Sequence, residues 1–220
     1  MSGPSNLRIA PDLLRFSLSS LIVFSFLLTG CKEKEYSEIS AAPGEIELQE
    51  ANADQAQKDL VKRGEYLITS IGCADCHSPK KMGERGPEED PELKLSGYRQ
   101  GNELPPIDQN AVEKGWILFT GDLTASVGPW GVSFAANLTS DETGIGNWTY
   151  EQFETAIRQG KYKGMKNNRD LLPPMPWPSY GLLSDDDLKA MFAYLKSTKP
   201  IKNAVPAPIP PDKIARMKKQ

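Results

Sequence analysis

Histidine and cysteine are scarce in this chain of 220 residues, which contains one histidine and three cysteines. Two of the cysteines and the histidine fall in a single run of five residues, Cys73-Ala74-Asp75-Cys76-His77. A structural zinc site needs four ligands, usually two separated pairs drawn from cysteine and histidine. Because the rest of the sequence offers no second pair, the ligand count excludes zinc at this run.

An excess of positive charge is also missing. The formal net charge is −3, and charged residues make up 25% of the chain. Proteins that bind nucleic acid usually carry a basic patch or stripe. The charge balance therefore excludes a nucleic-acid-binding function, and we expect any contact with a membrane to come from something other than a basic face.

The Cys-x-x-Cys-His spacing is the attachment signature of a c-type haem, in which two thiols bond to the porphyrin and the adjacent histidine ligates the iron. A redox-active dithiol is the alternative, because Cys-x-x-Cys also occurs in thioredoxin-like motifs. Those motifs lie next to βαβ patterns, which this sequence does not show. We therefore predict one covalent haem c, attached through Cys73 and Cys76, with His77 as an axial ligand.

The first 30 residues have the pattern of an export signal. Arg8 and Arg15 precede an apolar run at residues 16–28, which is followed by Gly30 and Cys31. A run of this length is short for a membrane-spanning helix. The pattern resembles bacterial lipoprotein signals, which implies cleavage before Cys31 and attachment of diacylglycerol to its thiol. An uncleaved N-terminal anchor helix is the alternative.

The rest of the chain fits one domain with extensions. We predict a signal peptide over residues 1–30, a flexible polar tether over 31–57, a folded domain over 58–198 and a proline-rich basic tail over 199–220. Residues 78–131 are rich in glycine, proline and charge. This composition predicts a loop-rich insertion on the domain surface, with one or two short strands.

Two amphipathic helices bracket the predicted domain. Apolar residues at helical spacing predict the first helix from about Asp54 to Ile71, with Gly64 on its apolar face. Ser184 and the three aspartates after it predict the start of the second helix, which Pro200 ends. Gly64 is either a tolerated weakness or the point where the second helix passes too closely for a side chain. We favour the close crossing.

A third helix is predicted shortly after the middle of the chain. Thr149 and Gln152 form a capping box for a helix from about Tyr150 to Gln159, and Gly160 ends it. Before it lie three short motifs: Pro-Trp-Gly at 129–131, Asn-Leu-Thr at 137–139 and Thr-Gly-Ile-Gly-Asn-Trp at 143–148.

The first helix with its internal glycine, the Cys-x-x-Cys-His run and the last helix together resemble a class I cytochrome c. The resemblance implies an all-α fold in which the N- and C-terminal helices cross beside a covalently bound haem. The three short motifs make the chain similar to the cytochrome c subunits of membrane-associated alcohol, aldehyde and gluconate dehydrogenases. Those subunits usually carry several haems, whereas this chain has one attachment motif.

The second axial position of the iron cannot be filled by histidine, since no second histidine exists. Methionine is the remaining soft ligand, and it raises the reduction potential in cytochromes c. Met175 lies in the stretch Leu-Leu-Pro-Pro-Met-Pro-Trp-Pro, whose prolines stiffen the backbone. We predict Met175 as this ligand, with Met165 as the alternative, because Met82, Met191 and Met217 are poorly placed in the sequence.

Further contacts are implied mainly by the resemblance. The other ring nitrogen of His77 is expected to donate to a backbone carbonyl. The resemblance implies the carbonyl of Pro129, and the carbonyl of Pro87 is the alternative. The side-chain N–H groups of three residues are expected to reach the haem propionates. These residues are Trp130, Asn137 and Trp148, although a buried tryptophan or a turn asparagine explains them equally well.

Together these features predict an exported electron carrier that is not an enzyme, anchored by lipid to a bacterial membrane and facing the periplasm or the outer side. It would carry single electrons between a respiratory dehydrogenase or quinol-oxidising complex and an oxidase or other acceptor. One alternative is a haem peroxidase or gas sensor with a displaceable methionine, which would lack a distal histidine. Another is a non-catalytic cytochrome subunit that positions a dehydrogenase at the membrane.

Overall fold

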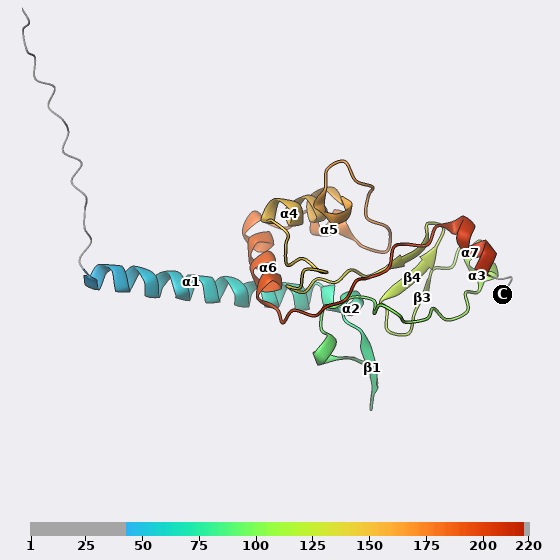
Figure 1. The fold of residues 1–220 in the computed structure, drawn as a ribbon, viewed down its shortest axis with the longest axis horizontal. Helices are drawn as coiled ribbons and strands as arrows, with labels where there is room; N and C mark the ends of the chain where they lie inside the picture. The colour runs from blue at the N-terminus through green and yellow to red at the C-terminus, as the bar shows by residue number, and fades with distance from the viewer. Residues whose placement is uncertain (1–42, 218–220) are drawn as a thin grey trace, which may run out of the picture. The chain divides into compact units, whose positions relative to one another are not determined.

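A computed structural model describes residues 43–217 of the chain, which Figure 1 shows as a ribbon. The predicted signal peptide and Cys31 lie outside the described residues. The helices are α1 (Pro43–Ser70), α2 (Cys73–His77), α3 (Gln109–Glu113), α4 (Tyr150–Gln159), α5 (Trp177–Tyr180), α6 (Asp185–Ser197) and α7 (Pro211–Met217), with short 3-10 turns at Pro91–Leu93 and Tyr162–Gly164. The strands are β1 (Lys80–Gly83), β2 (Gly86–Glu89), β3 (Leu118–Phe119), β4 (Ala125–Gly128) and β5 (Gly131–Phe134). In this part of the chain, none of the helices is both long and apolar enough to cross a membrane.

A close crossing of α1 and α6 forms the centre of the main core. A Cβ atom placed on Gly64 would lie 1.9 Å from the carbonyl oxygen of Ala190 and 2.7 Å from the Cβ of Tyr194. Glycine is therefore required by the approach of the second helix, as the sequence predicted. The buried side chains around the crossing include Leu67, Ile68, Leu188, Met191 and Leu195.

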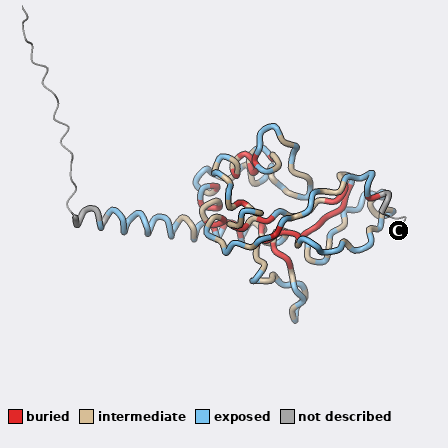
Figure 2. The backbone as a smooth tube through the Cα atoms, viewed as in Figure 1, coloured by how far each residue is buried: buried red, intermediate tan, exposed pale blue. Residues whose placement is uncertain are grey.

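Helix α1 begins earlier than the sequence predicted. It starts at Pro43 rather than near Asp54, so residues 43–57 of the predicted flexible tether are helical. Glutamate, alanine and glutamine dominate this stretch, and all three favour helix. An ion pair between Lys58 and Asp54, at 2.6 Å and one turn apart, adds local support. Figure 2 shows the exposed N-terminal part of α1, which becomes buried only towards α6.

The caps of the two later helices match the prediction. The backbone N–H of Asp187 donates to the Ser184 hydroxyl at 3.1 Å, which starts α6. Thr149 and Gln152 form both bonds of the capping box of α4. Gly160 ends that helix with a φ of +64°.

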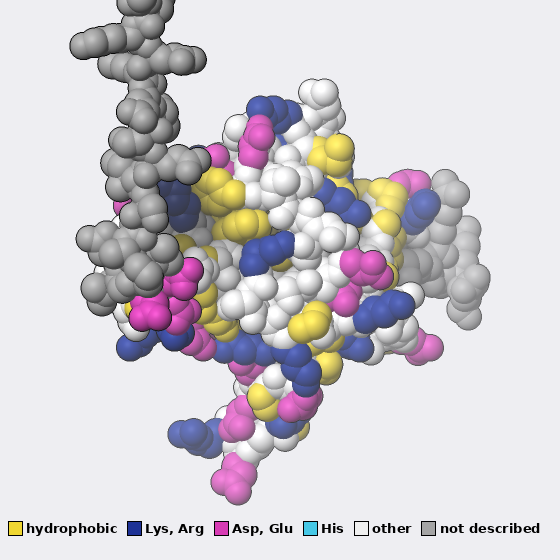
Figure 3. Space-filling view, turned by 60° about the vertical axis from the view of Figure 1, so that its left-hand side comes forward, with side chains coloured by type: hydrophobic (Ala, Val, Ile, Leu, Met, Phe, Trp, Pro, Cys, Tyr) yellow, Lys and Arg dark blue, Asp and Glu magenta, His cyan; other side chains and the backbone are white. Residues whose placement is uncertain are grey.

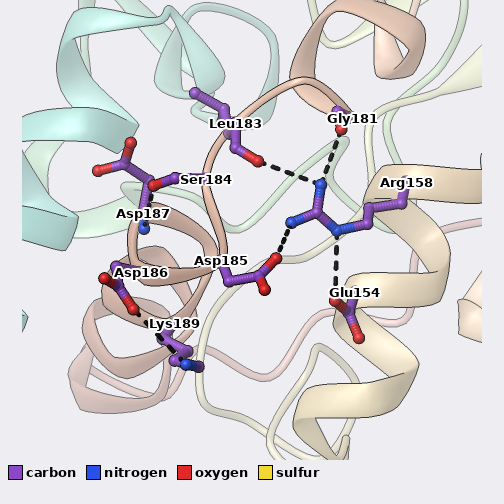
Figure 4. Close-up of polar contacts among 9 residues, drawn as sticks. All are labelled: Glu154, Arg158, Gly181, Leu183, Ser184, Asp185, Asp186, Asp187 and Lys189. Atoms are coloured by element: carbon purple, nitrogen blue, oxygen red, sulfur yellow. Dashed lines mark hydrogen bonds and ion pairs between the residues drawn. The ribbon is translucent and has the colours of Figure 1, made fainter.

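Arg158, in the last turn of α4, joins this helix to the start of α6 (Figure 4). Its guanidinium supplies donors to two backbone carbonyls of the loop between α5 and α6. The side chain donates to four groups, which are the carboxylates of Glu154 and Asp185 and the carbonyls of Gly181 and Leu183.

Five short strands lie between residues 80 and 134, so the all-α prediction is not confirmed. β1 and β2 form an antiparallel hairpin, and β3, β4 and β5 form an antiparallel sheet in that order. A two-residue turn, Pro129-Trp130, joins β4 to β5 between the paired Gly128 and Gly131. This second sheet is not a surface feature, because all four residues of β4 are buried.

After α6 the chain runs past the second sheet to α7, the last described element, as the red segment of Figure 1 shows. Asn203 anchors this segment, because its buried side chain accepts from the backbone N–H of Gln100 and donates to the carbonyls of Ser96 and Tyr98. Ile209 then pairs with Val132 of β5. Part of the predicted proline-rich basic tail is a helix, α7, over Pro211–Met217.

Candidate functional site

The Cys-x-x-Cys-His run forms the short helix α2 directly after α1. Gly72, at the start of α2, has a φ of +80°, a left-handed conformation that suits glycine. Residues three apart lie on one face of a helix, so Cys73 and Cys76 are presented together and His77 follows at the helix end. Cys73 is buried and Cys76 half-buried, and neither forms a disulfide.

The environment of the two thiols differs from that of a redox-active dithiol. Burial raises the pKa of Cys73 to about 12. The pKa of Cys76 is also raised, again chiefly by burial. Reactive Cys-x-x-Cys pairs need a cysteine whose pKa is lowered, so that a thiolate is present near neutral pH. The structure therefore gives no support to the dithiol alternative.

His77 is held in one orientation by a backbone carbonyl. Its Nδ1 lies 2.7 Å from the carbonyl oxygen of Ala136, so Nδ1 carries the proton and donates it. Burial lowers the pKa of His77, and the bond to Ala136 opposes that change only in part. The neutral ring then leaves the lone pair of Nε2 for a metal, the arrangement found for most ligating histidines.

The carbonyl that orients His77 is not the one implied by the resemblance. Pro129 was expected to accept this bond, with Pro87 as the alternative, and both assignments are wrong. Pro129 lies in the turn between β4 and β5, whereas Ala136 follows the end of β5. The hairpin carries the chain away from the histidine at its turn and returns it only after residue 134.

Met175 lies in the same apolar cluster as Cys73. It is partly buried and packs with the core that surrounds Cys73 and includes Ala74 of α2. The proline-rich stretch on either side of it lies between the second 3-10 turn and α5. Met175 is therefore a partly buried thioether in the cluster that also contains an attachment cysteine, and it is a candidate for the second axial ligand.

The other methionines are placed less favourably. Met165 is 56% exposed and lines a surface pocket of about 470 Å³ with polar residues such as Gln152 and Asn168. Met82 is exposed in β1, and Met191 is only 1% exposed within the α1–α6 core. Met217 lies in α7, far along the chain from α2. These positions favour Met175 over the alternatives.

Two hydroxyl groups that sequence reasoning missed hold the Met175 segment in place. The Tyr180 hydroxyl donates to the carbonyl of Ile71 at 2.9 Å, which ties α5 to the residue pair before α2. The Ser133 hydroxyl donates to the carbonyl of Pro173 at 2.7 Å, which ties the segment to β5. Isolated serine and tyrosine residues carry no motif, so no sequence signal marked either one.

Two of the three N–H donors expected to reach the haem propionates donate to other protein groups instead. The Trp130 indole donates to the Ser133 hydroxyl at 3.3 Å. The Asn137 amide donates to the Ile201 carbonyl at 2.8 Å and to the Thr143 hydroxyl at 3.2 Å. Trp148 packs against the main core. Trp130 and Asn137 therefore stabilise the polypeptide itself in this structure.

A covalent haem c requires two thiols for attachment and axial ligands for its iron. Among residues 43–217, no group of three or more His, Cys, Asp or Glu side chains could hold a bare metal ion. The same residues do provide two free thiols, one imidazole with an available Nε2 and a thioether in the same apolar cluster as Cys73. Arg99 has one buried guanidinium nitrogen, Nη1, with no hydrogen-bond partner among the described residues. A buried donor without a partner suits an anionic group such as a propionate, so the residues fit a covalent haem.

Comparison with known proteins agrees with this chemistry. The profile of the family named Cytochrome c matches residues 61–199. The gluconate 2-dehydrogenase cytochrome c subunit of Pantoea cypripedii is 35% identical over 142 residues, which cover 64% of this chain and 24% of the relative.

Two further relatives have similar names. The cytochrome c subunit of the quinone-dependent alcohol dehydrogenase of Gluconobacter oxydans is 31% identical over 153 residues, covering 69% of this chain and 24% of the relative. The fructose dehydrogenase cytochrome subunit of Gluconobacter japonicus is 28% identical over 148 residues, covering 66% and 23%. The chain thus spans about a quarter of the length of these relatives.

Proposed function

Because the chain belongs to the cytochrome c family, we propose that it is a single-haem electron carrier with histidine and methionine as the axial ligands. The observation that carries the proposal is that two free thiols precede, in the same short helix, an imidazole whose Nδ1 is fixed by the Ala136 carbonyl. This leaves one ring nitrogen, beside the attachment cysteines, available for iron.

Each residue then has a distinct role. Cys73 and Cys76 would bind the porphyrin covalently, and His77 Nε2 and the Met175 sulfur would be the two protein ligands of the iron. When bound, the haem supplies reversible one-electron chemistry at its iron. The chain orients the imidazole through Ala136 and excludes water with the apolar cluster around Cys73. No substrate-binding residues are required.

The partners and location follow from the relatives and from the N-terminal pattern. The relatives are cytochrome subunits of dehydrogenases, so we propose a dehydrogenase or quinol-oxidising complex as the electron donor. An oxidase or other protein would accept the electron. Lipid attached to Cys31 would anchor the carrier to a bacterial membrane, on the periplasmic or outer side.

A second function is favoured by the names of the relatives. The chain could be a non-catalytic subunit that stays bound to one dehydrogenase rather than a carrier that exchanges partners. Co-purification from detergent extracts separates the two functions. A stable, stoichiometric dehydrogenase partner supports the subunit, whereas recovery of the chain alone supports the carrier.

Spectroscopy of the purified protein tests the haem and its ligands. We expect one covalent haem per chain and, in the ferric state, the weak far-red band of methionine-to-iron ligation. Met175→Ala should remove that band, lower the reduction potential and allow the reduced protein to bind carbon monoxide. Met165→Ala is the matched control and should leave the band intact.

Two results would contradict this proposal. If the band survived in Met175→Ala and disappeared in Met165→Ala, the ligand would be Met165. If the unsubstituted protein lacked the band and bound carbon monoxide readily, an open iron site would replace the electron carrier as the better explanation.

A further inference from the structure

The ammonium group of Lys80 is held against the end of the haem-attachment helix. It donates to the carbonyl of Asp75 within α2, to that of Ser78 at 3.2 Å and to that of Asp122 at 3.1 Å. An ammonium group has three N–H donors, so these carbonyls occupy all of them. The charge is therefore fixed in position, unlike that of a free surface lysine.

No carboxylate neutralises this charge at close range. Among residues 43–217, the ion pairs within 4.0 Å do not include Lys80. The neighbouring acids have other partners: Asp122 accepts from the hydroxyls of Thr120 and Thr124, and Glu89, opposite Lys80 in the hairpin, pairs with Lys94 at 3.9 Å. Asp75 is exposed to solvent, which screens its charge.

The next residue of β1 differs from Lys80 in its exposure to solvent and in having a carboxylate partner. Adjacent residues of a strand point to opposite faces, and Lys81 is exposed and lies 4.0 Å from the Asp90 carboxylate. Figure 3 shows the mixed charges on the projecting hairpin, where lysine and arginine side chains lie beside aspartate and glutamate. Of these two lysines, Lys80 is the one whose ammonium contacts α2 and has no carboxylate of the described residues within 4.0 Å.

We propose that Lys80 acts as a fixed positive charge that stabilises the reduced state of the attached haem and so raises its reduction potential. The inference rests on the proposed function, because it requires a haem on Cys73 and Cys76. Ferric haem carries one more positive charge than ferrous haem, so a nearby cation disfavours the oxidised state. Lys80 is a positioning and electrostatic residue and does not ligate the iron.

Redox titration of the haem-bearing protein tests the proposal. Lys80→Met keeps a side chain of similar length without charge, and we expect the equilibrium constant for one-electron reduction to fall by about three- to tenfold, where tenfold corresponds to about 59 mV. Lys81→Met, the matched control on the same strand, should change it by less than about twofold. Lys80→Arg keeps the charge and should also stay within about twofold of the parent.

The far-red band is recorded for each variant, so that a change in ligation is distinguished from a change in charge. Equal potentials for Lys80→Met and Lys81→Met, with the band retained, would overturn the proposal. A large fall in Lys80→Arg would also overturn it, because the hydrogen bonds rather than the charge would then set the potential.

A variant that fails to attach haem is interpreted separately. If Lys80→Met carries no haem, Lys80→Gln is titrated in its place. If both fail while Lys80→Arg attaches haem, the residue acts in building α2, and the charge proposal is wrong. An unsubstituted protein without haem would instead contradict the proposed function.

Discussion

Replacing Gly64 by alanine is a direct test of the crossing between α1 and α6. The new Cβ would be placed 1.9 Å from the Ala190 carbonyl oxygen and 2.7 Å from the Tyr194 Cβ. Both are backbone or near-backbone atoms, which cannot move away by a side-chain rotation. The two helices would have to separate, and the apolar residues packed on either side of the crossing would lose contact.

The expected magnitude is a balance of two opposing effects. In an exposed helix interior, replacing glycine by alanine stabilises the helix by about 1 kcal/mol. Overpacking a well-packed core costs about 1–3 kcal/mol or more, and contact with backbone atoms places this site at the upper end. We expect a net loss of about 2 kcal/mol, which corresponds to a fall in Tm of roughly 4–8 °C for a domain of this size.

Equilibrium urea unfolding of the haem-bearing protein, followed by far-ultraviolet circular dichroism, measures the effect. Gln57→Ala, at an exposed position of the same helix, is the control and should change the unfolding free energy by less than about 0.5 kcal/mol. If Gly64→Ala were as stable as the parent or more stable, the close crossing would be refuted, and the glycine would be only a weak point of α1.

Two further predictions concern stability. Asn203→Ala should cost about 2 kcal/mol in urea unfolding, because the carbonyls of Ser96 and Tyr98 lose their buried donor; a change below about 0.5 kcal/mol would contradict this. The bond from Arg63 holds the pKa of Asp187 below its usual range, so acidification below pH of about 4 favours the unfolded state, which binds the proton more readily. Asp187→Asn should flatten the loss of stability between pH of about 4 and 2, and parallel pH profiles would refute the assignment.

Local signals predicted the helices well. Ser184 and the three aspartates after it mark the start of α6, and the capping box of Thr149 and Gln152 marks the start of α4. Each signal acts within one helical turn, so it can be read without knowing the fold. Gly64 was also informative, because a glycine on an apolar helix face suggests a close neighbour. The early start of α1 was not predicted, because the polar composition of residues 31–57 favours a flexible tether.

The strands could not be predicted in the same way. They are two to four residues long, too short for an alternating pattern to be recognised. The pairing of Val132 with Ile209 joins positions far apart in the sequence, and it depends on the path of the tail. The same limit applies to the site: Ala136 reaches His77 across 59 residues of chain, and any residue can provide a backbone carbonyl.

Residues 78–131, predicted as a surface insertion, contribute directly to the support of α2. Gly97 donates its backbone N–H to the His77 carbonyl at 2.7 Å, and Asp122 provides one of the carbonyls that hold Lys80. The β4–β5 hairpin then returns the chain to Ala136, which orients the histidine ring, and Ser133 of β5 holds the segment that carries Met175. The region and the strand that follows it therefore reach both proposed axial ligands. Its sequence can vary at the exposed turns, but its backbone path cannot change without moving the groups that would hold the iron.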